Sequence, residues 1–169
     1  MPEHDALARA LAAALHRLTE RADALRAALH GQRRAFVGAD AVALAALHET
    51  HAAEADRLHA AEREVVACRA ALCAALGAPD SVRVPALCAR LPGAVAEELD
   101  AAATTARAAL LALRVESAVG QRLLDATRRA QEGLWQALRG GTPDGQRYDR
   151  HARAVGTPDR SGSLLRGTV

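Results

Sequence analysis

The chain has 169 residues, which favours a single domain, and half of its residues are hydrophobic while only 2% are aromatic. A β-sandwich or β-barrel is disfavoured because strands need β-branched and aromatic residues, whereas the strong helix formers Ala, Leu, Arg and Glu dominate here. The formal net charge is +2, and residues 1–138 hold 16 Arg against 17 acidic residues, so the body lacks the charge excess of a nucleic-acid-binding face. The composition predicts an all-α protein.

Two long helices are predicted first in the chain, over residues 3–36 and 41–76, because apolar residues recur in both with heptad spacing. Gly38 ends the first run, and Asp40 is placed to cap the second helix by accepting from its free N–H groups. Gly77 followed by Pro79 predicts the end of the second helix. The first helix repeats Ala8, Leu15, Ala22, Leu29 and Phe36 beside Leu11, Leu18, Leu25 and Gln32; the second repeats Leu44, His51, Leu58, Val65 and Leu72.

The connection that follows, over residues 78–92, holds three prolines and predicts at most one short helical turn around residues 87–91. A third long helix is predicted over residues 93–139. Gly120 interrupts its apolar pattern and predicts a bend or a close approach of another helix. Residues 140–169 are rich in Gly, Pro, Arg and Ser and predict a flexible basic tail.

These elements predict an elongated antiparallel three-helix bundle with coiled-coil-like packing. The short link between the first two helices favours antiparallel packing, and the longer link returns the chain so that the third helix lies beside them. The helical bundle is expected to occupy residues 1–139 and the tail residues 140–169.

A metal site is the first chemistry to consider, because His48, His51 and Glu54 place nitrogen and oxygen ligands on adjacent turns of the second helix. A di-iron bundle needs an acid three residues before a His on each of two helices, and the pair Asp56 and His59 alone has that spacing. The simpler interpretation is a partly buried polar step in the heptad pattern, which fixes helix pairing. No metal and no cofactor are expected.

No arrangement typical of an enzyme occurs either. No His has the basic neighbours of a phosphotransfer domain, and neither a nucleophile elbow nor a phosphate-binding loop is present. Cys68 lies on the heptad pattern and is expected to be a small core residue, and the cysteines predict a reduced compartment. No signal peptide begins at Met1 and no apolar run is long enough to span a membrane, so a cytoplasmic location is expected.

A binding surface is predicted at the end of the third helix, which carries the only Trp of the chain. A Trp is hard to bury in a bundle of Ala and Leu, so the side chain either covers the end of the bundle or contacts a partner helix. In the tail, Tyr148 either anchors a short binding motif or is an ordinary linker residue. The candidate partner-binding residues are Leu123, Leu124, Leu134, Trp135, Leu138 and Tyr148.

The chain resembles the FlgN family of flagellar type III export chaperones over most of its length. The resemblance rests on the apolar-Gly-Asp turn at residues 35–40, on the end of the second helix at residues 69–77, and on the Leu pair at residues 123–124. The resemblance also includes the tail. The tail carries Tyr148-Asp149, followed by residues rich in Gly, Ser and Arg and then by Leu164-Leu165.

The resemblance implies a cytosolic chaperone that catalyses no reaction. Its partners would be the two hook–filament junction proteins, hook-associated proteins 1 and 3, whose sticky terminal helices it would cover to prevent premature assembly. The end of the third helix would take those terminal helices. The tail, anchored by Tyr148, would contact the cytoplasmic domain of the flagellar export gate.

Two other functions remain open at this stage. The long Ala and Leu pattern is also typical of a self-associating coiled-coil scaffold or adaptor without catalytic activity. A protein that binds a lipid or granule surface is the third alternative, although it would need a more basic polar face and more aromatic residues than this chain has.

Overall fold

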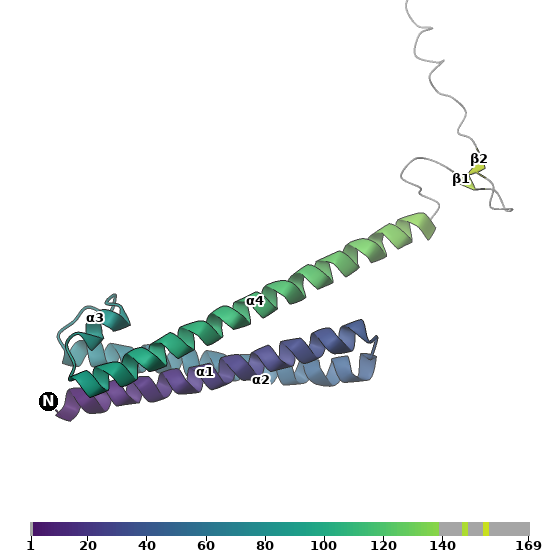
Figure 1. The fold of residues 1–169 in the computed structure, drawn as a ribbon. Helices are drawn as coiled ribbons and strands as arrows, with labels where there is room; N and C mark the ends of the chain where they lie inside the picture. The colour runs from purple at the N-terminus through teal and green to yellow at the C-terminus, as the bar shows by residue number, and fades with distance from the viewer. Residues whose placement is uncertain (1, 139–146, 149–153, 156–169) are drawn as a thin grey trace, which may run out of the picture. The chain divides into compact units, whose positions relative to one another are not determined.

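The computed structural model describes residues 2–138, 147–148 and 154–155, and within them the predicted all-α class is confirmed (Figure 1). The described residues form four α-helices and two strands of two residues each. The chain divides into two compact units, Met1–Gly120 and Gln121–Val169.

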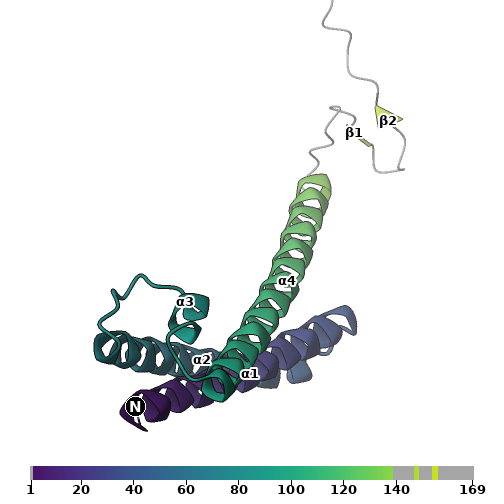
Figure 2. The same cartoon turned by 60° about the vertical axis from the view of Figure 1, so that its left-hand side comes forward.

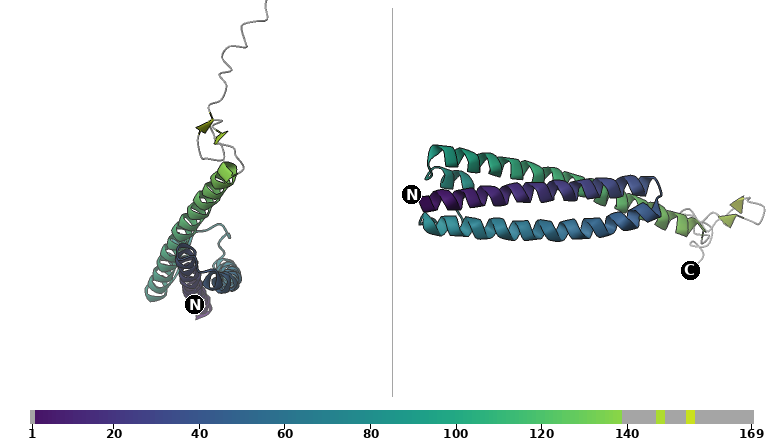
Figure 3. Two further views of the ribbon diagram at one scale, coloured as in Figure 1. Left: turned by 90° about the vertical axis from the view of Figure 1, so that its right-hand side faces the viewer. Right: turned by 90° about the horizontal axis from the view of Figure 1, so that it is seen from below.

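Helices α1 (Pro2–Val37) and α2 (Ala41–Ala75) lie side by side and are joined by a three-residue turn (Figure 3). Asp40 caps α2 as predicted, because its Oδ1 accepts a hydrogen bond from the backbone N–H of Ala43 at 2.9 Å. The left-handed position of the turn is taken by Ala39, with φ 54°, and not by the neighbouring Gly38. The turn therefore holds an alanine in a backbone conformation that favours glycine.

Gly77 follows the end of α2 in the left-handed conformation, with φ 59°, as expected for a residue just beyond a helix. The N–H of Ala78 closes the end by donating to the carbonyl of Cys73 at 2.8 Å. The short helix α3 (Val84–Cys88) then occupies the proline-containing connection, with Pro85 in its first turn. Figure 2 shows α3 beside the start of the next helix, where Leu87 joins the core.

Helix α4 (Gly93–Leu138) is continuous over 46 residues. Its first part shares both core clusters with α1 and α2, and in the right-hand view of Figure 3 α1 lies between α2 and this part of α4. The core has two clusters. The first holds Ala8, Leu11, Ala12, Leu15, Leu72, Cys73, Ala78, Leu87, Val95, Leu99, Ala102, Ala103 and Ala106. The second holds Leu18, Ala22, Leu25, Leu58, Ala61, Ala109 and Leu113.

Burial decreases along α1 toward its turn with α2. The heptad residues of α1 are buried as far as Leu25, whereas Leu29, Gln32 and Phe36 are only half-buried. The close approach of another helix predicted as one possibility at Gly120 is not found among the described residues, because a Cβ built there would meet no atom within 4 Å. The alternative prediction, a bend at Gly120, stays a prediction. The close approach of helices occurs instead at Gly31, where a Cβ would lie 3.2 Å from Cδ2 of Leu47.

The second unit contains the last part of α4 and the two short strands β1 (Arg147–Tyr148) and β2 (Ala154–Val155). The strands pair antiparallel, with Arg147 opposite Val155 and Tyr148 opposite Ala154. The rest of the predicted flexible tail, residues 140–146, 149–153 and 156–169, lies outside the described residues.

Candidate functional site

The predicted partner-binding residues at the end of α4 share one face of that helix. Their spacing places all five within about one third of the helix circumference. Leu123 is half-buried, while Leu124, Leu134, Trp135 and Leu138 are each about 60% exposed or more. Leu134 lies a whole number of heptads after Leu99 and Leu113, so in sequence this face repeats the apolar positions of the core.

Trp135 does not cover a packed core, because its side chain is 61% exposed. The exposed indole is flanked by the exposed Leu134 and Leu138, and large apolar groups in such clusters mark interaction surfaces. Tyr148 is the remaining predicted site residue. It lies in β1, and its side chain is outside the described part of the structure.

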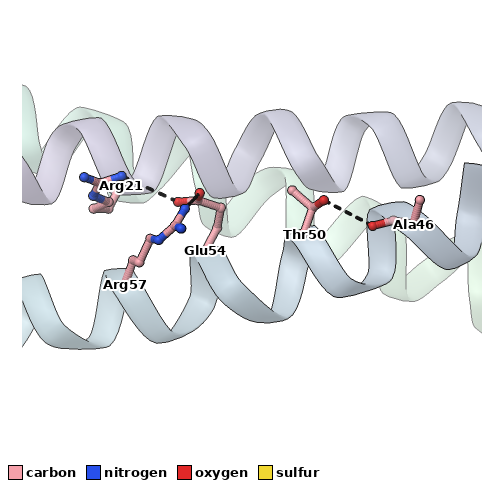
Figure 4. Close-up of polar contacts among 5 residues, drawn as sticks. All are labelled: Arg21, Ala46, Thr50, Glu54 and Arg57. Atoms are coloured by element: carbon pink, nitrogen blue, oxygen red, sulfur yellow. Dashed lines mark hydrogen bonds and ion pairs between the residues drawn. The ribbon is translucent and has the colours of Figure 1, made fainter.

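A charged residue, Glu54, interrupts the apolar heptad pattern of α2 where this helix faces α1 (Figure 4). Its carboxylate accepts a hydrogen bond from Arg57 on the same helix and forms an ion pair with Nη1 of Arg21 on α1, 3.9 Å from Oε2. The side chain of Glu54 is only 12% exposed. One turn earlier, the hydroxyl of Thr50 donates to the carbonyl of Ala46 at 3.1 Å.

These contacts hold Glu54 toward arginines and not toward the neighbouring histidines. His51 is half-buried and His48 is exposed, and neither forms an ion pair with Glu54. In the described ranges, no three or more His, Cys, Asp or Glu side chains are grouped so that they could hold a metal ion. The arrangement around Glu54 adds a polar contact between α1 and α2.

A second polar cluster joins α1 to α4 at Glu116. Its Oε1 lies 2.9 Å from Nη1 of Arg33 and 3.8 Å from Nδ1 of His30, and the Glu116 side chain is 18% exposed. A second nitrogen of Arg33 lies 2.9 Å from the same Nδ1. Glu116 stands one heptad after the buried Ala109, so the inner apolar pattern of α4 becomes polar at this point.

A third inter-helix contact, on the exposed surface, joins α1 to α2 through Arg17 and Glu64. The guanidinium donates twice, from Nε to Oε2 at 3.0 Å and from Nη2 to Oε1 at 2.6 Å. Hydrogen bonds from Arg17 hold the pKa of the Glu64 carboxyl below its ordinary value. Both side chains are close to half exposed, so solvent screens the pair.

The three cysteines are free, and two of them were not singled out from the sequence. Cys68 is half-buried against the first core cluster, in keeping with the prediction, but the fully buried thiol is that of Cys73. Burial raises the pKa of the Cys88 thiol. A buried thiol with few thiolate ions behaves as a small apolar group.

The largest feature that sequence reasoning missed is a second apolar pattern on the outer side of α4. Leu111 and Val115 are 62% and 58% exposed, and Val119 is 39% exposed. Their spacing of four residues is visible in the sequence. The leucines of the inner face of α4 recur with similar helical spacing, and they mask this second repeat in the sequence.

None of the known protein families, curated proteins or solved structures with which the chain was compared matches it. Across the described ranges, no helix combines the length and the apolar content that crossing a membrane requires.

Proposed function

We propose that the chain is a cytosolic export chaperone for flagellar hook–filament junction proteins. The observation that supports this proposal best is the exposed apolar face at the end of α4, which carries Trp135. A face of this kind suits an amphipathic helix, whose apolar side is buried against it while its polar side stays in water. The resemblance of the sequence to the FlgN family names the partners as the terminal helices of hook-associated proteins 1 and 3.

In this proposal residues 1–139 work as an elongated antiparallel three-helix bundle with coiled-coil-like packing. Residues 140–169 work as a flexible tail that contacts the cytoplasmic domain of the export gate through Tyr148. Among the described residues, neither core cluster includes an apolar residue from the end of α4, where Leu134, Trp135 and Leu138 are exposed. Exposed apolar residues of this kind are available to a partner. The chaperone catalyses no reaction, binds no nucleic acid and inserts into no membrane.

The test is a titration of a fluorescein-labelled terminal helical segment of a junction protein with the full chain, followed by fluorescence anisotropy. Replacing Leu134, Trp135 and Leu138 together with Ala should weaken binding by tenfold or more, because truncated anchor residues dominate such interfaces. The matched control replaces the exposed Val37, Val42 and Val66 with Ala and should bind like the unchanged chain.

Two results would contradict this proposal. Failure of the unchanged chain to bind either terminal segment would remove the family assignment, and normal binding by the triple Ala variant would remove the site. A self-associating scaffold is the second candidate, because the same exposed face of α4 can pair with a second copy. Sedimentation equilibrium over a range of concentrations distinguishes the two, since a scaffold gives a mass that rises above 17.7 kDa.

A further inference from the structure

The first part of α4, residues 93–120, carries apolar residues on two opposite sides. The inner side packs in the core, with Leu99, Ala106 and Leu113 buried. The opposite side carries the outer seam, which we define as Ala108, Leu111, Val115 and Val119, and all four are exposed. Ordinary surface helices have one apolar face and one polar face. A helix with a second apolar face lacks a partner on that side.

Arginines border the outer seam along one edge. When Ala108 and Val115 are taken as a positions of a heptad and Leu111 as the d position, Arg107 and Arg114 both occupy g positions. Both arginines are exposed, and within the described ranges neither forms an ion pair with a carboxylate. Residues at g positions form the ion pairs that select the partner of a coiled coil.

A second copy of this chain does not satisfy those arginines. The e positions of the same heptad are Ala112 and Val119, which carry no charge. Parallel pairing of two copies would place each arginine beside an apolar residue, and antiparallel pairing would place the arginines of the two copies together. Like charges brought together in an interface oppose that pairing.

We infer that the outer seam binds an amphipathic helix of another protein whose apolar edge is bordered by carboxylates. The leucine and valines of the seam bury the apolar edge of that helix, and Arg107 and Arg114 pair with its Glu or Asp side chains. This inference concerns a different surface from the end of α4 and holds whether or not the chain binds junction proteins.

The experiment uses the full chain and two fluorescein-labelled synthetic helices with Leu at their a and d positions. One helix carries Glu at its e and g positions, and the other carries Lys there. Anisotropy titrations should give saturable binding of the Glu helix at least tenfold tighter than of the Lys helix. Added salt should weaken binding of the Glu helix, because salt screens its ion pairs.

Variants test the surface. Replacing Leu111 and Val115 with Gln should weaken binding of the Glu helix by about tenfold or more. The matched control replaces Val42 and Val66, which are 83% and 60% exposed on α2, with Gln and should leave binding unchanged. These residues are all exposed, and circular dichroism should show the same helix content for every variant.

The charge-reversal variant is the sharper test. Changing Arg107 and Arg114 to Glu should invert the preference, so that the Lys helix binds more tightly than the Glu helix. The variant Leu134→Ala/Trp135→Ala/Leu138→Ala should keep its affinity for the Glu helix, which separates this surface from the end of α4.

Three results would overturn the inference. The first is equal binding of the two helices by the unchanged chain. The second is a Glu-helix affinity that does not change in the Leu111→Gln/Val115→Gln variant. The third is evidence that something else occupies the outer seam. The unchanged chain would form concentration-dependent dimers or co-sediment with vesicles of anionic lipid, and the Leu111→Gln/Val115→Gln variant would abolish that behaviour.

Discussion

The carboxylate of Glu116 in α4 lies 2.9 Å from the guanidinium of Arg33 in α1, at the heptad position that follows Ala109. The apolar packing of α4 against α1 thus ends in an ion pair. Because Glu116 is 18% exposed and Arg33 is 28% exposed, the pair is partly shielded from water. A partly shielded pair between two helices stabilises more than an exposed pair within one helix.

Replacing Glu116 with Ala should lower the free energy of unfolding by about 1 kcal/mol, because Arg33 loses its partner at a partly buried position. Urea denaturation followed by circular dichroism measures the change. A double-mutant cycle with Arg33→Ala isolates the pairwise energy. The paired arginine and glutamate within α4, Arg128 and Glu132, provide the control, since that exposed pair should show almost no coupling. Equal coupling in the two pairs would show that shielding does not matter here.

The turn between α1 and α2 offers a stabilising substitution. Ala39 has φ 54°, which costs an L-residue about 1–2 kcal/mol, so Ala39→Gly should stabilise the protein by about 0.5–1 kcal/mol after the entropy cost of glycine. Thermal unfolding measures this as a higher midpoint. Gly77→Ala should destabilise by a similar amount, because Gly77 has φ 59°. As a control, Ala45→Gly in the interior of α2 should destabilise by about 1 kcal/mol.

Two leucines on opposite sides of α4 form a matched pair for testing the core. Leu99 is fully buried, and Leu99→Ala should lower the free energy of unfolding by about 2–5 kcal/mol through lost burial and a residual cavity. Leu111 is 62% exposed, and Leu111→Ala should change the free energy of unfolding by no more than about 0.5 kcal/mol. Chemical denaturation of both variants gives the comparison. A similar loss for both would mean that the outer side of α4 is covered in solution.

Stability should depend on pH through Glu64. Hydrogen bonds from Arg17 lower the pKa of the folded carboxyl below that of the unfolded chain, so the pair stabilises above the unfolded pKa. That contribution is lost as the pH falls through the folded pKa. The difference in free energy of unfolding between the unchanged chain and Glu64→Gln should therefore be small but steady at neutral pH, and it should vanish only once the pH has fallen below the lowered pKa of the folded carboxyl.

The matched control for this pH dependence is Glu97→Gln. Glu97 is exposed on α4 and forms no ion pair with any described residue. Its replacement removes one surface carboxylate without removing an ion pair, so it measures the effect of losing a carboxylate alone. A profile for Glu64→Gln that runs parallel to that of the unchanged chain down to acid pH would remove the Arg17 pair as its cause.

The cysteines report on opening of the core. Cys73 is fully buried and should react with iodoacetamide only after the helices separate, whereas Cys68 is half-buried and should react faster. Burial raises the pKa of Cys88, so its small thiolate fraction should make it react slowly at neutral pH. Mass spectrometry of alkylated peptides follows each site. Leu99→Ala should accelerate labelling of Cys73, because both residues belong to the same core cluster.

The helices were predictable from local signals, since glycine, proline and capping residues act over a few positions. The predicted ranges 3–36, 41–76 and 93–139 compare with the observed Pro2–Val37, Ala41–Ala75 and Gly93–Leu138. The sequence does not predict that Ala39 takes the left-handed conformation. Three adjacent residues form the turn between α1 and α2, and local signals do not decide which of them has the positive φ. The same holds for Gly31, whose contact with Leu47 depends on the register of two helices.

The candidate site residues also differ in whether local sequence signals or the packing of the helices reveals them. The exposed residues at the end of α4 were identified because a Trp in an Ala-rich helix is conspicuous in the sequence. The division of the chain into residues 1–139 and 140–169 stays a prediction. So do the binding roles of all six candidate residues, Leu123, Leu124, Leu134, Trp135, Leu138 and Tyr148. The ion pairs of Glu54 and Glu116 needed three-dimensional placement, since Arg21 and Arg33 are far from them in sequence.

Within the part of the chain that the structure describes, half of the buried core residues are alanines, among them Ala8, Ala22, Ala102 and Ala106. A buried alanine hides much less apolar surface than a leucine, and the hydration of newly exposed apolar surface is the main source of the heat-capacity increase on unfolding. The heat-capacity change per residue should therefore fall below the usual range of about 12–15 cal/mol/K. The curve of stability against temperature should be unusually flat, so that cooling and moderate warming both change the folded population little.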